Sequence, residues 1–400
     1  MAATIITALL ALWLAFAAVG LAGALIFAHQ ARHFGRKRFA LPVPPPAVAA
    51  IVPMKDAGAQ AERCLASILA QDYPAYRVIV AVEAASDRAH GVACSVAPGE
   101  RAPLTVIAAG PATRCGQKVH NLLAALGALS AQDEIVCFVD ADALWPRETL
   151  STLVRELSAW HEPVVLSAYR WMFPAEPRAG AVLAAAASLP VAAAAKSPRW
   201  DLAWGGTMAA KRATLERLDL PRRWERSLSD DVPLSRALRQ GGRAAGASVK
   251  LMPNLFVPSP CDFSLDAAFG FARRQYAMLR LYSPRHWLFS FAVHAVFFAG
   301  LGASGAAVML PVPGYVLEMA AGGWALAFVR GLLHAAVVSR CLPKAVSRGL
   351  RWPCLLDALA PFLPALLHAY ALLASVRVRR VCWAGIAYTL AGNRVARVDH

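Results

Sequence analysis

The stretch EIVCFVDAD, residues 134–142, decides how this sequence is interpreted. Five apolar residues in a row, most of them β-branched or aromatic, predict a strand that is buried on both faces. Asp140 and Asp142 follow directly, so two carboxylates emerge where a buried strand meets solvent. Divalent cations such as Mg²⁺ and Mn²⁺ take oxygen ligands, often one or two carboxylates together with substrate phosphates. The pattern therefore predicts a metal site, although a solvated turn would also explain it.

Strands and helices alternate along the chain around this stretch. The segments AVAAIVP (47–53), YRVIVAVE (76–83) and LTVIAA (104–109) are short, apolar and rich in β-branched residues, as buried strands are. Residues 59–71 and 119–129 carry apolar side chains at helical spacing. This alternation predicts the α/β class, with a mainly parallel sheet covered by helices on both faces. In such sheets ligands bind beyond the carboxyl ends of the strands.

The composition indicates a hybrid of a membrane protein and an enzyme domain. The chain has 400 residues, of which 58% are hydrophobic and 16% charged, and its formal net charge is +16. Such a composition excludes a disordered tail, and eight scattered cysteines without a CxxC pair argue against structural zinc and a disulfide framework. Much of the basic excess flanks apolar stretches and no basic motif is interleaved with aromatic residues, so we expect no nucleic-acid partner.

The apolar stretches predict how the chain meets the membrane. Residues 1–30 contain a run without charge that is long enough to span the hydrocarbon core, and residues 286–340 read as a transmembrane helical hairpin. Basic residues follow the first run (Arg32, Arg36, Lys37 and Arg38), which by the positive-inside rule places them and the following domain, residues 40–285, in the cytoplasm. We therefore expect a multi-pass protein of the cell membrane.

Two further segments are less regular. Residues 352–376 contain Pro361 and Pro364, and a crossing here would place the basic tail, residues 377–400, outside the cell. We therefore expect a re-entrant or interfacial pair of helices bent at the prolines, with the tail in the cytoplasm, which a reporter fused after His400 would test. Residues 179–196 are nearly uncharged and small-sided, and are expected to lie in the lipid interface rather than in the core.

Several motifs of residues 40–285 resemble a known enzyme family. The first four are VPMKDAG (52–58), QDYPAYRVIVAVEAASD (71–87), GQKVHNL (116–122) and FVDAD (138–142). Two more follow, WGGTMAAKRATLERL (204–218) and SDDVPLSRALRQGG (229–242). Together they resemble the nucleotide-sugar half of family 2 and family 21 glycosyltransferases, most of all the ceramide glucosyltransferase group. The resemblance implies a GT-A fold for the catalytic domain. It also implies one membrane segment on the N-terminal side of this domain and two to three on its C-terminal side.

The resemblance also implies roles for residues on the donor side. Pro53 and Lys55, with Glu83 and Asp87, would hold the uridine of a UDP-sugar. Glu83 stands where the family usually has Asp or Gln. Lys118 would contact phosphate, although a solvated lysine at a helix start is an equal alternative. Asp140 would face the ribose or the diphosphate, and Asp142, with Asp140 beside it, would bind Mg²⁺ or Mn²⁺.

Asp230 and Asp231 precede a predicted helix, VPLSRAL. Acids in this position cap a helix and complement its dipole, which is one interpretation of the pair. The resemblance matches Asp231 to the last acid of the family's ED motif and so implies a general base, with Asp230 beside it. A carboxylate within hydrogen-bond reach can take the proton of an acceptor hydroxyl.

A basic segment, FARRQYAMLRLYSPRHW (271–287), precedes the membrane hairpin. The family has a (Q/R)xxRW motif in this region that grips the diphosphate and the acceptor. Arg274 is the best match to its arginine, but it is followed by Gln275 rather than tryptophan. Interfacial anchoring is the alternative role for these arginines.

These observations predict an inverting, metal-dependent membrane glycosyltransferase that moves a hexose from a UDP-sugar to the hydroxyl of a membrane lipid. A polysaccharide synthase or a polyprenyl-phosphate sugar transferase of the same family is the alternative. The altered (Q/R)xxRW motif and the few membrane segments count against polymer synthesis. A non-catalytic scaffold of the same fold is a third possibility, against which the acidic residues argue.

Overall fold

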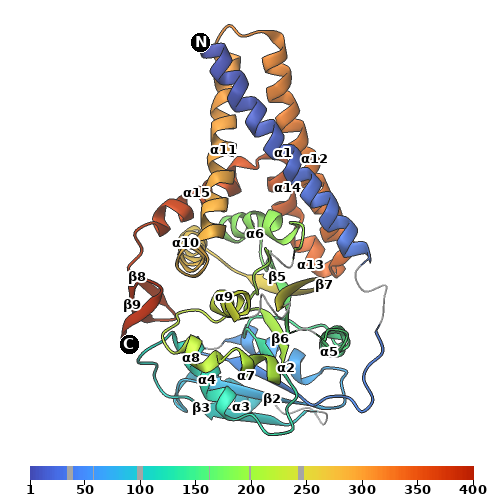
Figure 1. The fold of residues 1–400 in the computed structure, drawn as a ribbon, viewed down its shortest axis with the longest axis vertical. Coiled ribbons are helices and arrows are strands. Elements are labelled where there is room, and N and C mark those ends of the chain that lie inside the picture. Colours follow the sequence, from blue (N-terminus) through green and yellow to red (C-terminus); the bar gives the residue numbers. More distant parts are fainter. Residues whose placement is uncertain (34–38, 57, 97–101, 162, 198–199, 242–246) are drawn as a thin grey trace. The chain divides into compact units, whose positions relative to one another are not determined.

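The computed structural model describes residues 1–33, 39–56, 58–96, 102–161, 163–197, 200–241 and 247–400. The chain forms two compact units, each shown in Figure 1. The helical unit comprises Met1–His33, Trp171–Ala195 and Pro260–Arg377, and the sheet unit comprises Phe34–Arg170, Lys196–Ser259 and Val378–His400. Of the basic residues expected to follow the first membrane helix, Arg36, Lys37 and Arg38 lie outside the described residues.

Seven strands form the main sheet, in the order β3-β2-β1-β4-β6-β5-β7. Strands β1 to β4 pair in parallel, and β6 pairs antiparallel with both β4 and β5. The strands are β1 Val48–Pro53, β2 Tyr76–Val82, β3 Leu104–Ala108, β4 Ile135–Val139, β5 Val164–Pro174, β6 Thr207–Lys211 and β7 Ser248–Cys261. This mixed α/β sheet confirms the fold class expected from the sequence.

The sheet is covered by helices on both faces, which explains the continuous apolar runs of its central strands. All six residues of β1 are buried, and they alternate between two hydrophobic clusters: Val48, Ala50 and Val52 pack into one, Ala49 and Ile51 into the other. The strand β3, expected to be equally buried, is instead the edge of the sheet, where Thr105 and Ala108 are exposed. The helices of this unit are α2 Ala59–Leu69, α3 Arg88–Ser95, α4 Gln117–Gly127, α5 Thr149–Ser158, α7 Arg212–Arg217, α8 Leu220–Trp224 and α9 Asp231–Gly241.

Three helices of the helical unit are long and apolar enough to cross a membrane, judged by length and composition. These are α1 Ala2–His33, α11 Pro284–Met309 and α12 Gly314–Cys341, which lie side by side in Figure 1. The ring of Trp13 on α1 packs against Gly300 of α11 and Gly323 of α12, where any side chain would collide with it. Small residues allow such close packing between apolar helices. One N-terminal and two C-terminal candidate membrane helices are thus confirmed.

The region expected to form a bent pair consists of α14 Arg351–Leu359 and α15 Phe362–Ser375, whose axes differ by 89°. The bend lies at Ala360 and Pro361, between the two helices. Pro364 does not add a second bend, because it lies in the first turn of α15, where a missing backbone N–H costs nothing. The other helices of this unit are α6 Ala179–Ala192, α10 Leu265–Tyr282 and α13 Lys344–Gly349.

The helix α6 differs from the sequence expectation. Most of its residues, among them Ala181, Ala185 and Leu189, are buried, and it packs against α10, α14 and α15. A helix that is apolar all round has no polar face to present to lipid headgroups, so it becomes a core helix instead. The interfacial interpretation of residues 179–196 is therefore wrong for most of the helix.

Residues expected to form only a basic tail fold into a second sheet within the sheet unit. Its strands, β8 Arg380–Trp383, β9 Ile386–Ala391 and β10 Arg394–Asp399, are antiparallel and in sequential order. Along β9 the side chains of Ile386, Tyr388 and Leu390 are buried in alternation, the period expected of a strand with one covered face. Arginines flank this strand on both sides, at positions 377, 379, 380, 394 and 397, and their density led to the expectation of a basic tail.

Candidate functional site

Four carboxylates and two cations meet beyond the carboxyl end of β4. Asp140 and Asp142 follow this strand, Lys118 lies in the first turn of α4, Arg170 lies on β5, and Asp230 and Asp231 lie at the start of α9. We call these six residues the carboxylate cluster. All of them except Arg170 are predicted site residues.

Each of the two cations of the cluster forms ion pairs with two of its carboxylates. The Nζ atom of Lys118 lies 2.6 Å from Oδ1 of Asp140 and 2.8 Å from Oδ1 of Asp230. A guanidinium nitrogen of Arg170 lies 2.8 Å from Oδ2 of Asp142, and a second lies 3.7 Å from Oδ2 of Asp140. Asp140 therefore contacts both cations. The pair Lys118–Asp230 joins residues 112 positions apart in the chain.

Two glycines allow these elements to approach. A Cβ atom on Gly205 would lie 2.8 Å from Nζ of Lys118, and one on Gly116 would lie 2.6 Å from the carbonyl oxygen of Leu228. Gly205 belongs to the WGG turn before β6, and Gly116 precedes α4. A side chain at either position would separate Lys118 from the acids it binds.

The environment sets the charge state of each group. Burial disfavours the charged form of Lys118, but the carboxylates of Asp140 and Asp230 outweigh it and raise the pKa of this lysine. Burial opposes ionisation of Asp140 as well, yet Lys118 and Arg170 hold its pKa below the ordinary value. For Asp142, burial raises the pKa, Arg170 opposes the shift and Asp140 adds to it. Burial also raises the pKa of Asp230, to about 6, despite Lys118.

Asp230 and Asp231 are adjacent but differ in their surroundings. Asp230 is 1% exposed, and both of its carboxylate oxygens accept hydrogen bonds from Lys118. Asp231 is only partly buried; its Oδ1 accepts from Ser229 Oγ and Val232 N, and its Oδ2 accepts from Gly205 N. Among the described residues Oδ2 accepts this one hydrogen bond, and because a carboxylate oxygen accepts about two, it can accept another from a further donor. The more accessible carboxylate of the pair is Asp231.

The cluster is suited to a divalent cation whose remaining ligands are the oxygens of a diphosphate. Within the described parts of the chain, no group of three or more His, Cys, Asp or Glu is arranged to hold a metal by itself. Asp140 and Asp142 supply two carboxylates at one strand end, and the side chain of Asp142 is 34% exposed. Four acids against two bases leave the cluster electronegative, and Mg²⁺ commonly binds through one or two carboxylates plus substrate phosphates. Asp140 and Asp142 are the residues that would hold it.

A second group of polar residues follows β1 and β2. Lys55 Nζ lies 2.6 Å from Oε2 of Glu83, and this carboxylate raises the pKa of Lys55 against the effect of burial. Asp87 caps α3 by accepting from Ala89 N, and the same oxygen accepts from Asp56 N. Its other oxygen, Oδ2, is buried and has no hydrogen-bond partner among the described residues. Pro53 ends β1 beside this group.

The described geometry brings together most of the predicted site residues, in two groups of the same unit. Arg274 and Gln275 lie instead on α10 of the helical unit, where the guanidinium of Arg274 lies 5.6 Å from the ring centroid of Phe271. Arg170 was missed, although its position offered a signal. It is a single arginine in the largely buried strand β5, and a charge in such a strand needs a partner.

Replacing Lys118 should show how much this side chain contributes to the stability of the folded protein. We expect Lys118→Met to lower the free energy of unfolding by about 3–5 kcal/mol, because Asp140 and Asp230 lose a largely buried partner. Adding Asp230→Asn should recover part of this loss, which a double-mutant cycle quantifies. Thermal unfolding followed by tryptophan fluorescence measures both. Strictly additive effects would contradict a direct Lys118–Asp230 interaction.

Three glycosyltransferases are among the solved structures to which the chain is similar, each at low sequence identity. A mannosyltransferase from Pyrobaculum calidifontis in complex with GDP-mannose and Mn²⁺ is 21% identical, with a TM-score of 0.49 over 92% of this chain and 97% of that one. TarS from S. aureus in complex with UDP-GlcNAc is 12% identical, with a TM-score of 0.38 over 87% and 98%. Glucosyl-3-phosphoglycerate synthase from Mycobacterium tuberculosis, with Mn²⁺, UDP and phosphoglyceric acid, is 17% identical, with a TM-score of 0.39 over 61% and 84%.

No curated protein gave a significant sequence match. The family model described as glycosyl transferase family 21 matches residues 12–396, which include both the helical and the sheet unit. This confirms the family that the motifs implied. With the carboxylate cluster at the end of β4 and a family match over nearly its whole length, the chain belongs to glycosyltransferase family 21 and is a sugar-nucleotide-dependent glycosyltransferase.

Proposed function

We propose that the enzyme transfers a hexose from a UDP-sugar to the hydroxyl group of a membrane lipid, with inversion at the anomeric carbon. The observation that carries this proposal is the carboxylate cluster. It combines two acids suited to a metal–diphosphate complex with a third, Asp231, that is partly exposed and has a free lone pair on Oδ2.

Asp140, Asp142 and Asp231 have separate roles in the proposed reaction. Asp140 and Asp142 would hold the divalent ion, which when bound neutralises the charge of the departing diphosphate. Asp231 takes the proton of the acceptor hydroxyl on Oδ2. The hydroxyl oxygen then forms a bond to the anomeric carbon as the bond from that carbon to the diphosphate oxygen breaks. A single displacement of this kind inverts the configuration.

The remaining residues of the cluster position these groups. Lys118 ties Asp140 to Asp230, and Arg170 ties Asp142 to Asp140. Both cations are also suited to bind phosphate oxygens when the donor enters, and Arg170 can do so with two nitrogens at once. Gly205 N–H fixes Oδ2 of Asp231 at 3.2 Å. We propose, as the resemblance implies, that Arg274 and Gln275 contact the donor or the acceptor.

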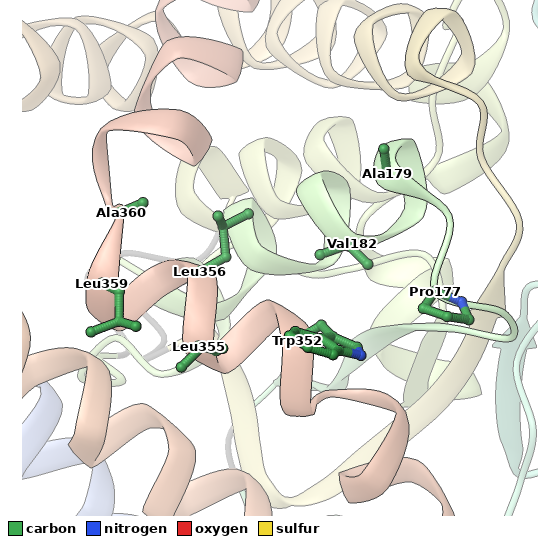
Figure 2. Close-up of a pocket in the computed structure, with 8 residues that line it drawn as sticks. All are labelled: Pro177, Ala179, Val182, Trp352, Leu355, Leu356, Leu359 and Ala360. Carbon is green, nitrogen blue, oxygen red and sulfur yellow. The ribbon is translucent and has the colours of Figure 1, made fainter.

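An apolar cavity in the helical unit supports a lipid as the acceptor. Figure 2 shows this cavity between α6 and α14. Its volume is about 620 Å³. Its lining carries no charged side chain: Pro177, Ala179, Val182, Trp352, Leu355, Leu356, Leu359 and Ala360. Such a surface suits an alkyl chain. The three helices able to span a membrane support a multi-pass protein, and the basic residues that follow the first of them in the sequence support a cytoplasmic location of the sheet unit.

A transfer assay tests this function. The enzyme, purified in detergent, is incubated with Mn²⁺, a lipid extract and radiolabelled UDP-glucose, UDP-galactose or GDP-mannose. We expect label to enter the organic phase from a UDP-hexose, and the anomeric proton of the product to have the configuration opposite to that of the donor. Label in a precipitable polymer would favour a polysaccharide synthase. Transfer from GDP-mannose alone would contradict the UDP donor.

A further inference from the structure

The second sheet, β8–β10, is joined to the loops that follow β1, β2 and β3. The buried hydroxyl of Tyr388 accepts a hydrogen bond from the backbone N–H of Gln117, at 3.1 Å. The buried side chain of Gln117 accepts from Ala112 N and donates to Gly110 O and to Asn121 Oδ1. Asn121 in turn donates to the carbonyl oxygens of Met54 and Ala81.

This network fixes His400, which follows β10, against the group formed by Lys55 and Glu83. Nε2 of His400 lies 2.9 Å from the carbonyl oxygen of Ala112. A carbonyl oxygen only accepts hydrogen bonds, so Nε2 carries the hydrogen and Nδ1 faces Glu83. Nδ1 lies 3.7 Å from Oε1 of Glu83, while Lys55 binds the other oxygen, Oε2, at 2.6 Å.

The spacing between His400 and Glu83 is suited to a ligand. At 3.7 Å the two atoms are too far apart for a hydrogen bond, and in the neutral imidazole both are acceptors. A single N–H group entering at this point can donate to either atom, and Lys55 can donate to a carbonyl oxygen beside it. An N–H next to a carbonyl is the edge that uracil presents. The side chain of His400 is 36% exposed, so this position is accessible.

We propose that His400 forms, with Lys55 and Glu83, the group that binds the base of the donor nucleotide, and that the sheet β8–β10 serves to position it. This inference rests on the proposed function, because it assumes a UDP-sugar bound beyond the ends of β1 and β2. It assigns a binding role to a segment that the sequence presents only as a basic tail. Uracil presents a ring N–H between two carbonyl oxygens at this edge, whereas the corresponding ring nitrogen of cytosine is an acceptor, so the group favours uracil over cytosine.

Calorimetric titration of the full-length protein with UDP, CDP and pyrophosphate, each with Mn²⁺, tests the proposal. His400→Ala should weaken UDP binding about 5- to 10-fold, as expected for one lost hydrogen-bonding group, and reduce the preference for UDP over CDP. Pyrophosphate binding should not change, because it has no base. His400→Gln, which can still donate to Ala112 O and accept an N–H, should retain part of the affinity.

The control is Arg397→Ala on β10, which removes a side chain that is 75% exposed and paired only with Asp399 among the described contacts. It should bind all three ligands as the wild type does. Unchanged or tighter UDP binding by His400→Ala would overturn the inference alone. Equal weakening of UDP and pyrophosphate would do the same, since it would indicate a general structural effect. If the wild type itself does not bind UDP, the proposed function fails, and the inference fails with it.

Discussion

Asp231→Asn should lower kcat for sugar transfer by about 10²- to 10⁴-fold, the usual contribution of a general base, while UDP binding stays close to that of the wild type. The asparagine oxygen can still accept from Ser229 Oγ and Val232 N, so the start of α9 keeps its cap. The amide nitrogen, however, has no lone pair to take a proton. It also faces the N–H of Gly205 in place of Oδ2.

The transfer assay under saturating donor, together with UDP titration, separates these two effects. Glu216→Gln is a matched control, because this carboxylate is 62% exposed on α7 and pairs with Arg212 within the same helix. We expect the control to retain full activity. Near-normal turnover by Asp231→Asn would contradict the general base. It would instead favour an acceptor such as a polyprenyl phosphate, whose oxygen is already ionised and needs no base.

Asp142→Ala should abolish the Mn²⁺-dependent stabilisation of the protein by UDP. For the wild type, UDP at 100 times its dissociation constant should raise the free energy of unfolding by about 2.7 kcal/mol. Without the Asp142 carboxylate, only Asp140 remains at the strand end to hold the ion, and the gain should fall to that of UDP without metal.

Thermal unfolding in detergent measures this, with UDP or GDP, with and without Mn²⁺. Chelation of the metal by EDTA should reduce the wild-type shift to the value of the variant. Glu216→Ala, a change of the same type at an exposed site, should keep the full shift. A full shift in Asp142→Ala would exclude this residue as a metal ligand. No shift with either nucleotide in the wild type would contradict the donor site and favour a non-catalytic scaffold.

Local sequence patterns predicted many of the strands and membrane helices of this protein, because runs of apolar residues suffice to identify them. The apolar runs that form β1, β2 and β4 mark strands buried on both faces, and the carboxyl end of β4 had to place Asp140 and Asp142 at the edge where ligands bind. The apolar stretches at both ends predicted the candidate membrane helices, since length and hydropathy suffice for that. Motif resemblance gave the family.

Features that depend on residues distant in the chain could not be predicted from local sequence patterns. Whether α6 lies in an interface or in a core depends on α10, α14 and α15, which its own composition does not specify. Arg170 is one arginine among many until β5 and β6 bring it to Asp142. The arginines of residues 377–400 suggested a tail, but alternate buried residues on β9 hold the strands against the domain.

The fold class, the family and the acids at the end of β4 follow from the amino-acid sequence, because each is encoded in a contiguous pattern of hydrophobicity and charge. Which acid is accessible and which is paired with a cation depends on the folded chain. Asp230 and Asp231 are neighbours of the same type, yet Lys118, from a distant helix, binds Asp230 and leaves Oδ2 of Asp231 open. Burial and charge pairing are properties of the folded chain, so no local pattern could distinguish the two.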